Sequence, residues 1–84
     1  MIEGMVIQIL PPDRLVISQG TADGVVDGLV FAVRFERSTD APEKCRVRVV
    51  ASGRNTTTCE ATESPLPNIV LPGDYVHEVA PEPS

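Results

Sequence analysis

The chain has 84 residues, which is enough for one small domain and too few for two. Its net charge of −5 at pH 7 disfavours general binding to nucleic acids or anionic lipid surfaces, and no apolar run is long enough to insert into a membrane. With three aromatic residues and 12 valines, the composition favours β-strands over helices.

Three segments in the first half of the chain alternate apolar and polar residues, as half-buried strands do. Residues 4–10 and 14–19 are separated only by Pro11-Pro12-Asp13, so we expect an antiparallel hairpin. Residues 29–36 alternate most clearly, and we expect this strand at the centre of the core. The residues predicted to face inward on the three strands are Met5, Ile7, Ile9, Leu15, Ile17, Leu29, Phe31, Val33 and Phe35.

Glycines mark the predicted turns. Gly20, Gly24 and Gly28 punctuate the loop after the second strand, and Gly24 and Gly28 are expected to adopt positive φ. Gly73 and Asp74 form another turn before the last strand, in which the Asp74 carboxylate can accept backbone N–H bonds. These five residues are therefore predicted to serve the backbone rather than chemistry.

The second half of the chain predicts a hairpin and a final strand. Residues 44–51 and 56–62 flank a turn at 52–55, and residues 75–79 follow a loop rich in proline. No segment shows helical periodicity of useful length. The residues predicted to face inward on the hairpin are Cys45, Val47, Val49, Thr57, Cys59 and Ala61.

Cys45 and Cys59 are predicted to be free thiols. Pairing the two inward sets places Val47 opposite Cys59 and Cys45 opposite Ala61, so the cysteines become diagonal neighbours with Cα atoms roughly 7–8 Å apart. A disulfide usually requires about 4.4–6.8 Å. A zinc site needs four clustered ligands, and only His77 is left to help.

The six short strands and their turns account for residues 1–79 as one domain, followed by a flexible Pro-rich tail at 80–84. Strands in so small a chain need their edges protected, and closing the sheet on itself removes the edges. We therefore predict an all-β fold, a small closed or nearly closed β-barrel of about six mostly antiparallel strands.

The order of motifs along residues 4–79 resembles a known family. The motifs are Gly4-x-Val6, Leu15-Val16-Ile17, Gly20, Gly24-Val25-x-x-Gly28-x-x-Phe31-x-Val33, Cys45-Arg46-Val47-Arg48-Val49 and Leu71-Pro72-Gly73-Asp74-x-Val76. They look like the small C-terminal β-barrel of the flagellar assembly protein T family, and more loosely are similar to cradle-loop and translation-factor-type barrels with a Gly-Asp turn. The resemblance implies a non-catalytic accessory or interaction barrel within a larger assembly, and it assigns no functional residue.

The residues that could act as nucleophiles lack the partners that catalysis requires. His77 is the only histidine, and a Cys–His pair with Cys59 would need a thiolate, which burial among Val and Ala disfavours. Ser18, Ser38 and Ser52 have no context that resembles a nucleophile elbow. We predict that the protein is not an enzyme.

The remaining polar residues predict neither a metal site nor a cofactor. Asp23 and Asp27 flank one loop, which could either bind calcium or form a solvated turn. We prefer the solvated turn, because a calcium site needs more converging oxygens. The glycines from Gly20 to Gly28 lack the lysine and the following helix of a phosphate-binding loop.

Charge is distributed unevenly along the chain. Six of the seven basic residues lie between positions 34 and 54, where the net charge is +3, whereas the rest of the chain carries −8. Arg34, Arg46 and Arg48 are predicted to face outward as a basic stripe, with Lys44 and Arg54 alongside. Charged outward positions also protect strand edges without any binding function, and this alternative stays open.

These observations predict a non-catalytic protein-binding or structural module, as part of a larger assembly or by self-association. Arginine is enriched in protein interfaces, and acidic surface on a second copy could meet the stripe. The alternative is a barrel that binds RNA or single-stranded nucleic acid through the same arginines. If the 84 residues are the whole chain we expect a cytoplasmic protein; for a domain excised from a longer protein the sequence predicts no compartment.

Overall fold

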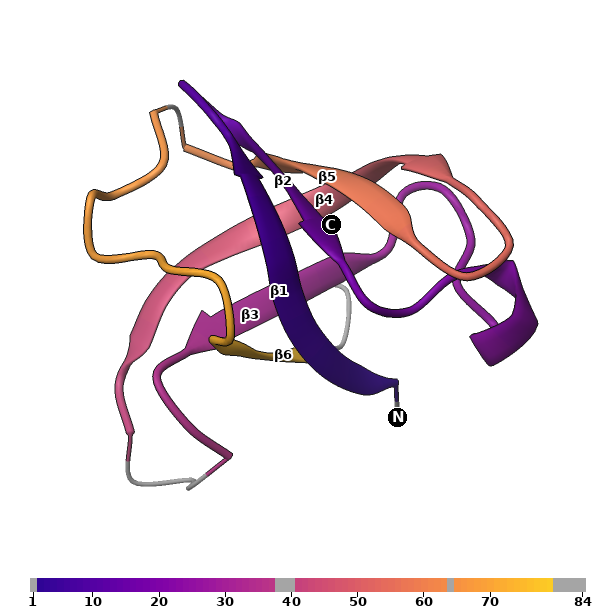
Figure 1. Ribbon diagram of the computed structural model, residues 1–84, viewed down its shortest axis with the longest axis horizontal. Helices are drawn as coiled ribbons and strands as arrows, with labels where there is room; N and C mark the ends of the chain where they lie inside the picture. The colour runs from indigo at the N-terminus through magenta and orange to yellow at the C-terminus, as the bar shows by residue number, and fades with distance from the viewer. Residues whose placement is uncertain (1, 38–40, 64, 80–84) are drawn as a thin grey trace, which may run out of the picture.

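The computed structural model describes residues 2–37, 41–63 and 65–79 (Figure 1). Within these residues the chain forms a closed barrel of six antiparallel strands, in the order β1-β2-β5-β4-β3-β6, which confirms the predicted fold class. The strands are β1 (Glu3–Leu10), β2 (Arg14–Ile17), β3 (Val30–Arg34), β4 (Glu43–Ser52), β5 (Thr57–Ala61) and β6 (Tyr75–Val79), with one 3-10 turn, η1 (Thr21–Asp23). The predicted tail at 80–84 lies outside the described residues.

The barrel interior is filled mainly by β-branched and other apolar side chains. Phe31 is the largest of them and is fully buried, as are Leu15 and Ile17 on β2. Burying one side chain of this size stabilises the fold by about 1.5–3 kcal/mol. The inward positions predicted on β2 and β5 are confirmed, and on β4 Val47 and Val49 are buried whereas Cys45 is half-buried. Val25, Leu66 and Val70 enter the core from the loops.

The predicted inner face of β1 is wrong for its first half. Val6 is fully buried, whereas Met5 is 49% and Ile7 43% exposed. The run from Met5 to Leu10 is apolar on both faces except at Gln8, so alternation alone cannot choose between the two faces. The pairing with β2 also shifts register between Val6 and Gln8, which turns the second half of the strand relative to the first.

The predicted strand at 29–36 is shorter in the structure. β3 ends at Arg34, and Phe35 is 67% exposed instead of facing the core. The β3–β4 pairing shifts register at this point: Val33 lies opposite Cys45 and Arg34 opposite Glu43, so Lys44 is an extra residue on β4. This bulge ends the regular alternation on both strands.

The predicted β4–β5 register is wrong by two residues, yet the expectation of free thiols is confirmed. Val47 lies opposite Ala61 and Val49 opposite Cys59, with a register shift between Val49 and Ala51. Cys45 therefore lies beyond the end of β5. Both cysteines are free, Cys59 buried and Cys45 half-buried.

The loops gather at two opposite ends of the barrel (Figure 1). One end, which we call the hairpin end, is formed by residues 18–29 and by the turn at 53–56. The other, which we call the open end, is formed by the turn at 11–13 and by the described residues between β3 and β4 and between β5 and β6. Gly24 and Gly28 at the hairpin end have φ of 93° and 91°, as predicted.

Candidate functional site

The predicted basic stripe lies on the outer surface of β3 and β4. Ala32 on β3 pairs with Arg46 on β4, and Val30 pairs with Arg48, so the two β4 arginines follow each other along one face. Arg34 continues this face at the end of β3. The structure therefore brings these three arginines onto neighbouring strands, as the sequence predicts.

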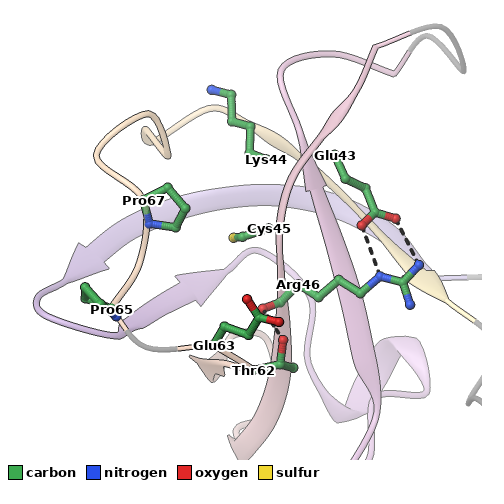
Figure 2. Close-up of a pocket in the computed structure, with 8 residues that line it drawn as sticks. All are labelled: Glu43, Lys44, Cys45, Arg46, Thr62, Glu63, Pro65 and Pro67. Atoms are coloured by element: carbon green, nitrogen blue, oxygen red, sulfur yellow. Dashed lines mark hydrogen bonds and ion pairs between the residues drawn. The ribbon is translucent and has the colours of Figure 1, made fainter.

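Two of the three arginines share one carboxylate within the chain. Arg46 donates from Nε and Nη2 to the Glu43 carboxylate, at 3.0 Å and 3.1 Å (Figure 2). Arg34 Nη2 lies 3.7 Å from the same carboxylate. The hydrogen bond from Arg46 and the charges of both arginines hold the pKa of Glu43 below its usual value. Glu43 is thus the hub of the stripe, a role the sequence analysis did not assign to it.

Arg34 also connects β3 to β6. Its Nε donates to His77 Nε2 at 2.9 Å, and Nη1 donates to the carbonyl of Ala41. The His77 ring stacks on Tyr75, with centroids 5.7 Å apart. His77 therefore links Arg34 on β3 to Tyr75 on its own strand, β6.

A second polar group continues the network onto β1. Tyr75 donates its hydroxyl hydrogen to Glu3, and Arg37 Nη2 lies 3.2 Å from the same carboxylate. The Tyr75 hydrogen bond is the main cause that lowers the pKa of Glu3; burial, followed by the same bond, raises the pKa of Tyr75. Glu3 and Tyr75 are 72 residues apart in sequence, so no spacing signal could have revealed the pair.

Lys44 does not belong to the outer stripe, which corrects its predicted outward position. Its Nζ lies 2.9 Å from Asp74 Oδ2 and 2.7 Å from the carbonyl of Ile69, and the two charged side chains are only 12% and 6% exposed. Lys44 is the extra residue of the β4 bulge, which directs its side chain toward the 69–74 segment. Asp74 Oδ2 also accepts the Leu71 N–H at 2.9 Å, which confirms the predicted turn bond.

Three residues with large, exposed apolar side chains contact this buried ion pair. We call them the apolar rim: Phe35 is 67%, Ile69 59% and Leu71 56% exposed. The contacts of Lys44 and Asp74 hold them together, because Lys44 Nζ lies 5.5 Å from the centroid of the Phe35 ring and bonds the Ile69 carbonyl, while Asp74 bonds the Leu71 N–H. The sequence analysis did not predict the apolar rim, because it placed Phe35 in the core.

A cavity of about 470 Å³ opens beside the apolar rim. Figure 2 shows the Cys45 thiol between β4 and the two prolines, Pro65 and Pro67, that form the opposite wall. Burial, with smaller effects from Asp74 and Glu43, raises the pKa of Cys45 to about 11, so the thiol stays protonated at neutral pH. Lys44 is shared between the cavity and the rim, which makes the two features continuous.

Arg48 and Arg54 differ from the other predicted interface residues. Neither makes an ion pair or a side-chain hydrogen bond with another described residue. Arg54 lies in the turn between β4 and β5 at the hairpin end, where its carbonyl accepts the Ala22 N–H at 3.0 Å. The five residues predicted to form one interaction site are therefore divided among the outer face, the open end and the hairpin end.

The structure does not bring together the residues that the sequence analysis considered as candidates for catalysis or metal binding. Cys59 is buried inside the barrel on β5, and burial raises the pKa of its thiol to about 12, whereas His77 lies on β6, which does not neighbour β5. Asp23 accepts the Gly20 N–H at 3.0 Å, and Asp27 accepts from Ser52 at 3.1 Å.

Ser18 and Ser38 are the other two serines considered as nucleophiles in the sequence analysis. Ser18 Oγ accepts the Met5 N–H at 3.1 Å, and Ser38 lies outside the described residues. In the part of the chain that the structure describes, no three His, Cys, Asp or Glu side chains are grouped so as to hold a metal ion, and no helix is long and apolar enough to cross a membrane.

Comparison with known proteins adds no family to these observations. No family model matches the chain, and no curated protein matches it. The resemblance to the flagellar assembly protein T barrel therefore stays a prediction.

Proposed function

We propose that the barrel is a non-catalytic protein-binding module that docks onto a partner through the apolar rim and the cavity beside it. The observation that carries the proposal is the grouping of Phe35, Ile69 and Leu71 around one buried ion pair, each more than half exposed. Single exposed apolar residues are common on protein surfaces, whereas a cluster that borders a cavity is typical of an interaction site.

The rim is held in place before any partner arrives. Lys44 fastens the 69–74 segment to β4 with two hydrogen bonds, and Asp74 fixes the Leu71 backbone. A surface that is ordered in advance loses less conformational entropy on binding than a flexible one. This order favours a docking surface over a loop that is exposed only because it has little to pack against.

The size of the surface favours a short segment of a partner protein over a second folded copy. The three rim side chains offer on the order of 350 Å², below the roughly 800 Å² that each partner buries in a stable interface between folded proteins. A cavity of about 470 Å³ has room for a few side chains. The partner we propose is an extended peptide that covers the rim and inserts an apolar side chain beside Cys45.

The nucleic-acid alternative receives less support from the outer face. A phosphate would have to compete with Glu43 for Arg34 and Arg46, and Lys44 is already bound to Asp74. Retention on heparin at low salt tests this alternative, because an Arg46→Gln, Arg48→Gln variant of a nucleic-acid binder should lose retention. Native protein that passes straight through such a column counts against it.

A displayed library of random peptides tests the docking proposal. We expect the peptides selected on the wild-type barrel to bind Phe35→Ser and Leu71→Ser variants at least about tenfold more weakly, a loss of about 1.4 kcal/mol. Val26→Ser is the matched control, because Val26 is 58% exposed and lies at the hairpin end. Peptides that bind all three variants equally, or a library that yields none, would contradict the proposal.

The oligomeric state separates a peptide partner from a second copy. Light scattering coupled to size exclusion should show a monomer across concentrations if the rim takes a peptide. A dimer that Phe35→Ser dissociates would assign the rim to self-association instead.

A further inference from the structure

The hydrogen bond between Arg34 and His77 gives the two ring nitrogens of the histidine different roles. Arginine nitrogens only donate, so His77 Nε2, which lies 2.9 Å from Arg34 Nε, must accept. The other ring nitrogen, Nδ1, lies 3.3 Å from the carbonyl of Glu78, a position suited to an N–H donor. Both contacts fit an imidazole tautomer that carries its hydrogen on Nδ1.

We propose that His77 is a pH-sensitive clasp that holds the Arg34 guanidinium against β6 only while the imidazole is neutral. Protonation places a hydrogen on Nε2, so the nitrogen can no longer accept, and it brings two cations face to face. Arg34 then leaves β6 and closes onto Glu43, whose carboxylate already lies 3.7 Å from Nη2. Acidification thus exchanges a link between β3 and β6 for one between β3 and β4.

Charged and polar groups on the neighbouring strands determine which partners a protonated His77 ring would have. Glu3 on β1 lies opposite His77 in the strand pairing, Tyr75 stacks on the ring, and Glu43 on β4 lies beyond Arg34. The positive charges nearby are Arg34, Arg46 on β4 and Arg37, which is bound to Glu3. The pKa of each carboxylate is lowered, for Glu3 mainly by the hydrogen bond from Tyr75 and for Glu43 mainly by the hydrogen bond from Arg46.

These carboxylates make re-pairing the expected outcome instead of unfolding. Glu3 lies opposite His77 in the strand pairing, so a protonated ring would have a carboxylate on the neighbouring strand. Arg34 has one in Glu43. Each cation therefore keeps a carboxylate partner in the acid state, so the barrel can remain closed while the outer-face network changes.

Nuclear magnetic resonance of the ¹⁵N-labelled protein tests the clasp directly. At neutral pH the ring should show hydrogen on Nδ1 and a bare Nε2. On acidification the Arg34 Nε–H signal and the amides of Tyr75–Val79 should move with the same midpoint as the ring. A ring with its hydrogen on Nε2 at neutral pH would overturn the proposal.

Two variants make the test specific. In His77→Gln the side-chain oxygen can still accept from Arg34 but does not titrate, so the Arg34 signal should stay constant over the same range. In Arg34→Gln the guanidinium that changes partner is absent, so the amides of Tyr75–Val79 should move less on acidification than in wild type. An Arg34 signal that moves equally in His77→Gln, or Tyr75–Val79 amides that move as far in Arg34→Gln as in wild type, would overturn the proposal; wild-type amide dispersion in both variants shows that they are folded. No partner is needed, so the result is independent of the docking proposal.

Discussion

Backbone hydrogen bonds close both ends of the barrel, but the two ends differ in what else holds them. At the hairpin end, backbone meets backbone: Thr21 N–H bonds the Gly53 carbonyl at 2.8 Å, and a Cβ on Gly20 would lie 2.4 Å from that same oxygen. At the open end the Leu66 N–H likewise bonds the Pro12 carbonyl at 2.9 Å, and the buried Lys44–Asp74 pair adds a side-chain link between β4 and the segment before β6. The close approach at Gly20 leaves no space for a side chain there, whereas the ion pair lies beside a cavity and the apolar rim.

This difference indicates that the open end can bind a partner, whereas the hairpin end tolerates few substitutions. A surface built from side chains can alter its specificity by substitution while the barrel persists, which suits a docking site. The close backbone approach at Gly20 constrains the fold instead. The comparison predicts that substitutions at the two ends will fail for different reasons.

The largest effect is expected for Lys44→Ala at the open end. Removing Lys44 leaves the Asp74 carboxylate, 6% exposed, without its cation, and breaking a buried pair of this kind costs about 4 kcal/mol of unfolding free energy. Denaturation in urea measures the loss. Arg48→Ala is the control, because Arg48 is exposed and should change stability by less than about 0.5 kcal/mol.

A second variant shows whether the cost comes from an unpaired charge. Lys44→Met combined with Asp74→Asn removes both charges, and the side-chain oxygen of the introduced asparagine can still accept the Leu71 N–H. The double variant should recover at least half of the loss. If it is as unstable as Lys44→Ala, packing of the lysine stem and not charge holds the open end together.

At the hairpin end the matching test is Gly20→Ala. The added methyl group would lie 2.4 Å from Gly53 O and 2.5 Å from Arg54 C, so the backbone of the 53–56 turn must move, and we expect a loss of about 3 kcal/mol. Gly28→Ala is the control: its φ of 91° is strained for alanine, but no atom lies within 4 Å, so about 1 kcal/mol is expected. Equal losses in thermal unfolding would mean that backbone strain, not close approach, dominates at this end.

The sequence predicts the barrel better than it predicts the site. Alternation on β2, β4 and β5 identifies most inward residues because each strand has one polar face, whereas β1 is apolar on both faces and its first half was assigned to the wrong one. Lys44 and Phe35 were misplaced by a single bulge, which adds one residue that the period-two pattern cannot reveal. The site depends on that bulge, so its placement required the three-dimensional register.

The two thiols extend the comparison from the barrel interior to the open end. Burial raises the pKa of Cys59 to about 12 and that of Cys45 to about 11, from an ordinary value of 9.0. Below pH 9 the folded and unfolded chains both keep these protons. Above pH 9 the unfolded chain releases its thiol protons before the folded chain does. Each thiol therefore lowers the unfolding free energy by up to about 1.4 kcal/mol per pH unit, until the pH reaches the pKa of that thiol in the folded chain.

The pH dependence is measured by urea denaturation between about pH 8 and pH 11 in wild type, Cys59→Ala and Cys45→Ala. Removing Cys59 should flatten the decline over the whole range, whereas removing Cys45 should flatten it less near the upper limit. A disulfide-exchange reagent at about pH 8 should modify Cys45 at the cavity before Cys59 and should find two thiols in denatured protein. A Cys59 that reacts first would show that the interior opens more readily than the open end.

The smallest effect is expected for Arg14→Ala, and it tests whether burial is what separates the ion pairs. Arg14 Nε lies 3.3 Å from Glu60 Oε2, close to the Lys44–Asp74 separation of 2.9 Å, but the two side chains are 54% and 41% exposed. Water already solvates both charges in the unfolded and folded chain, so the pair should contribute less than about 0.5 kcal/mol, and salt should reduce even that. Urea denaturation at low and high salt measures it beside Lys44→Ala. If Arg14→Ala costs as much as Lys44→Ala, then the contrast between a buried ion pair and a solvated surface pair, on which the distinct character of the open end depends, does not hold.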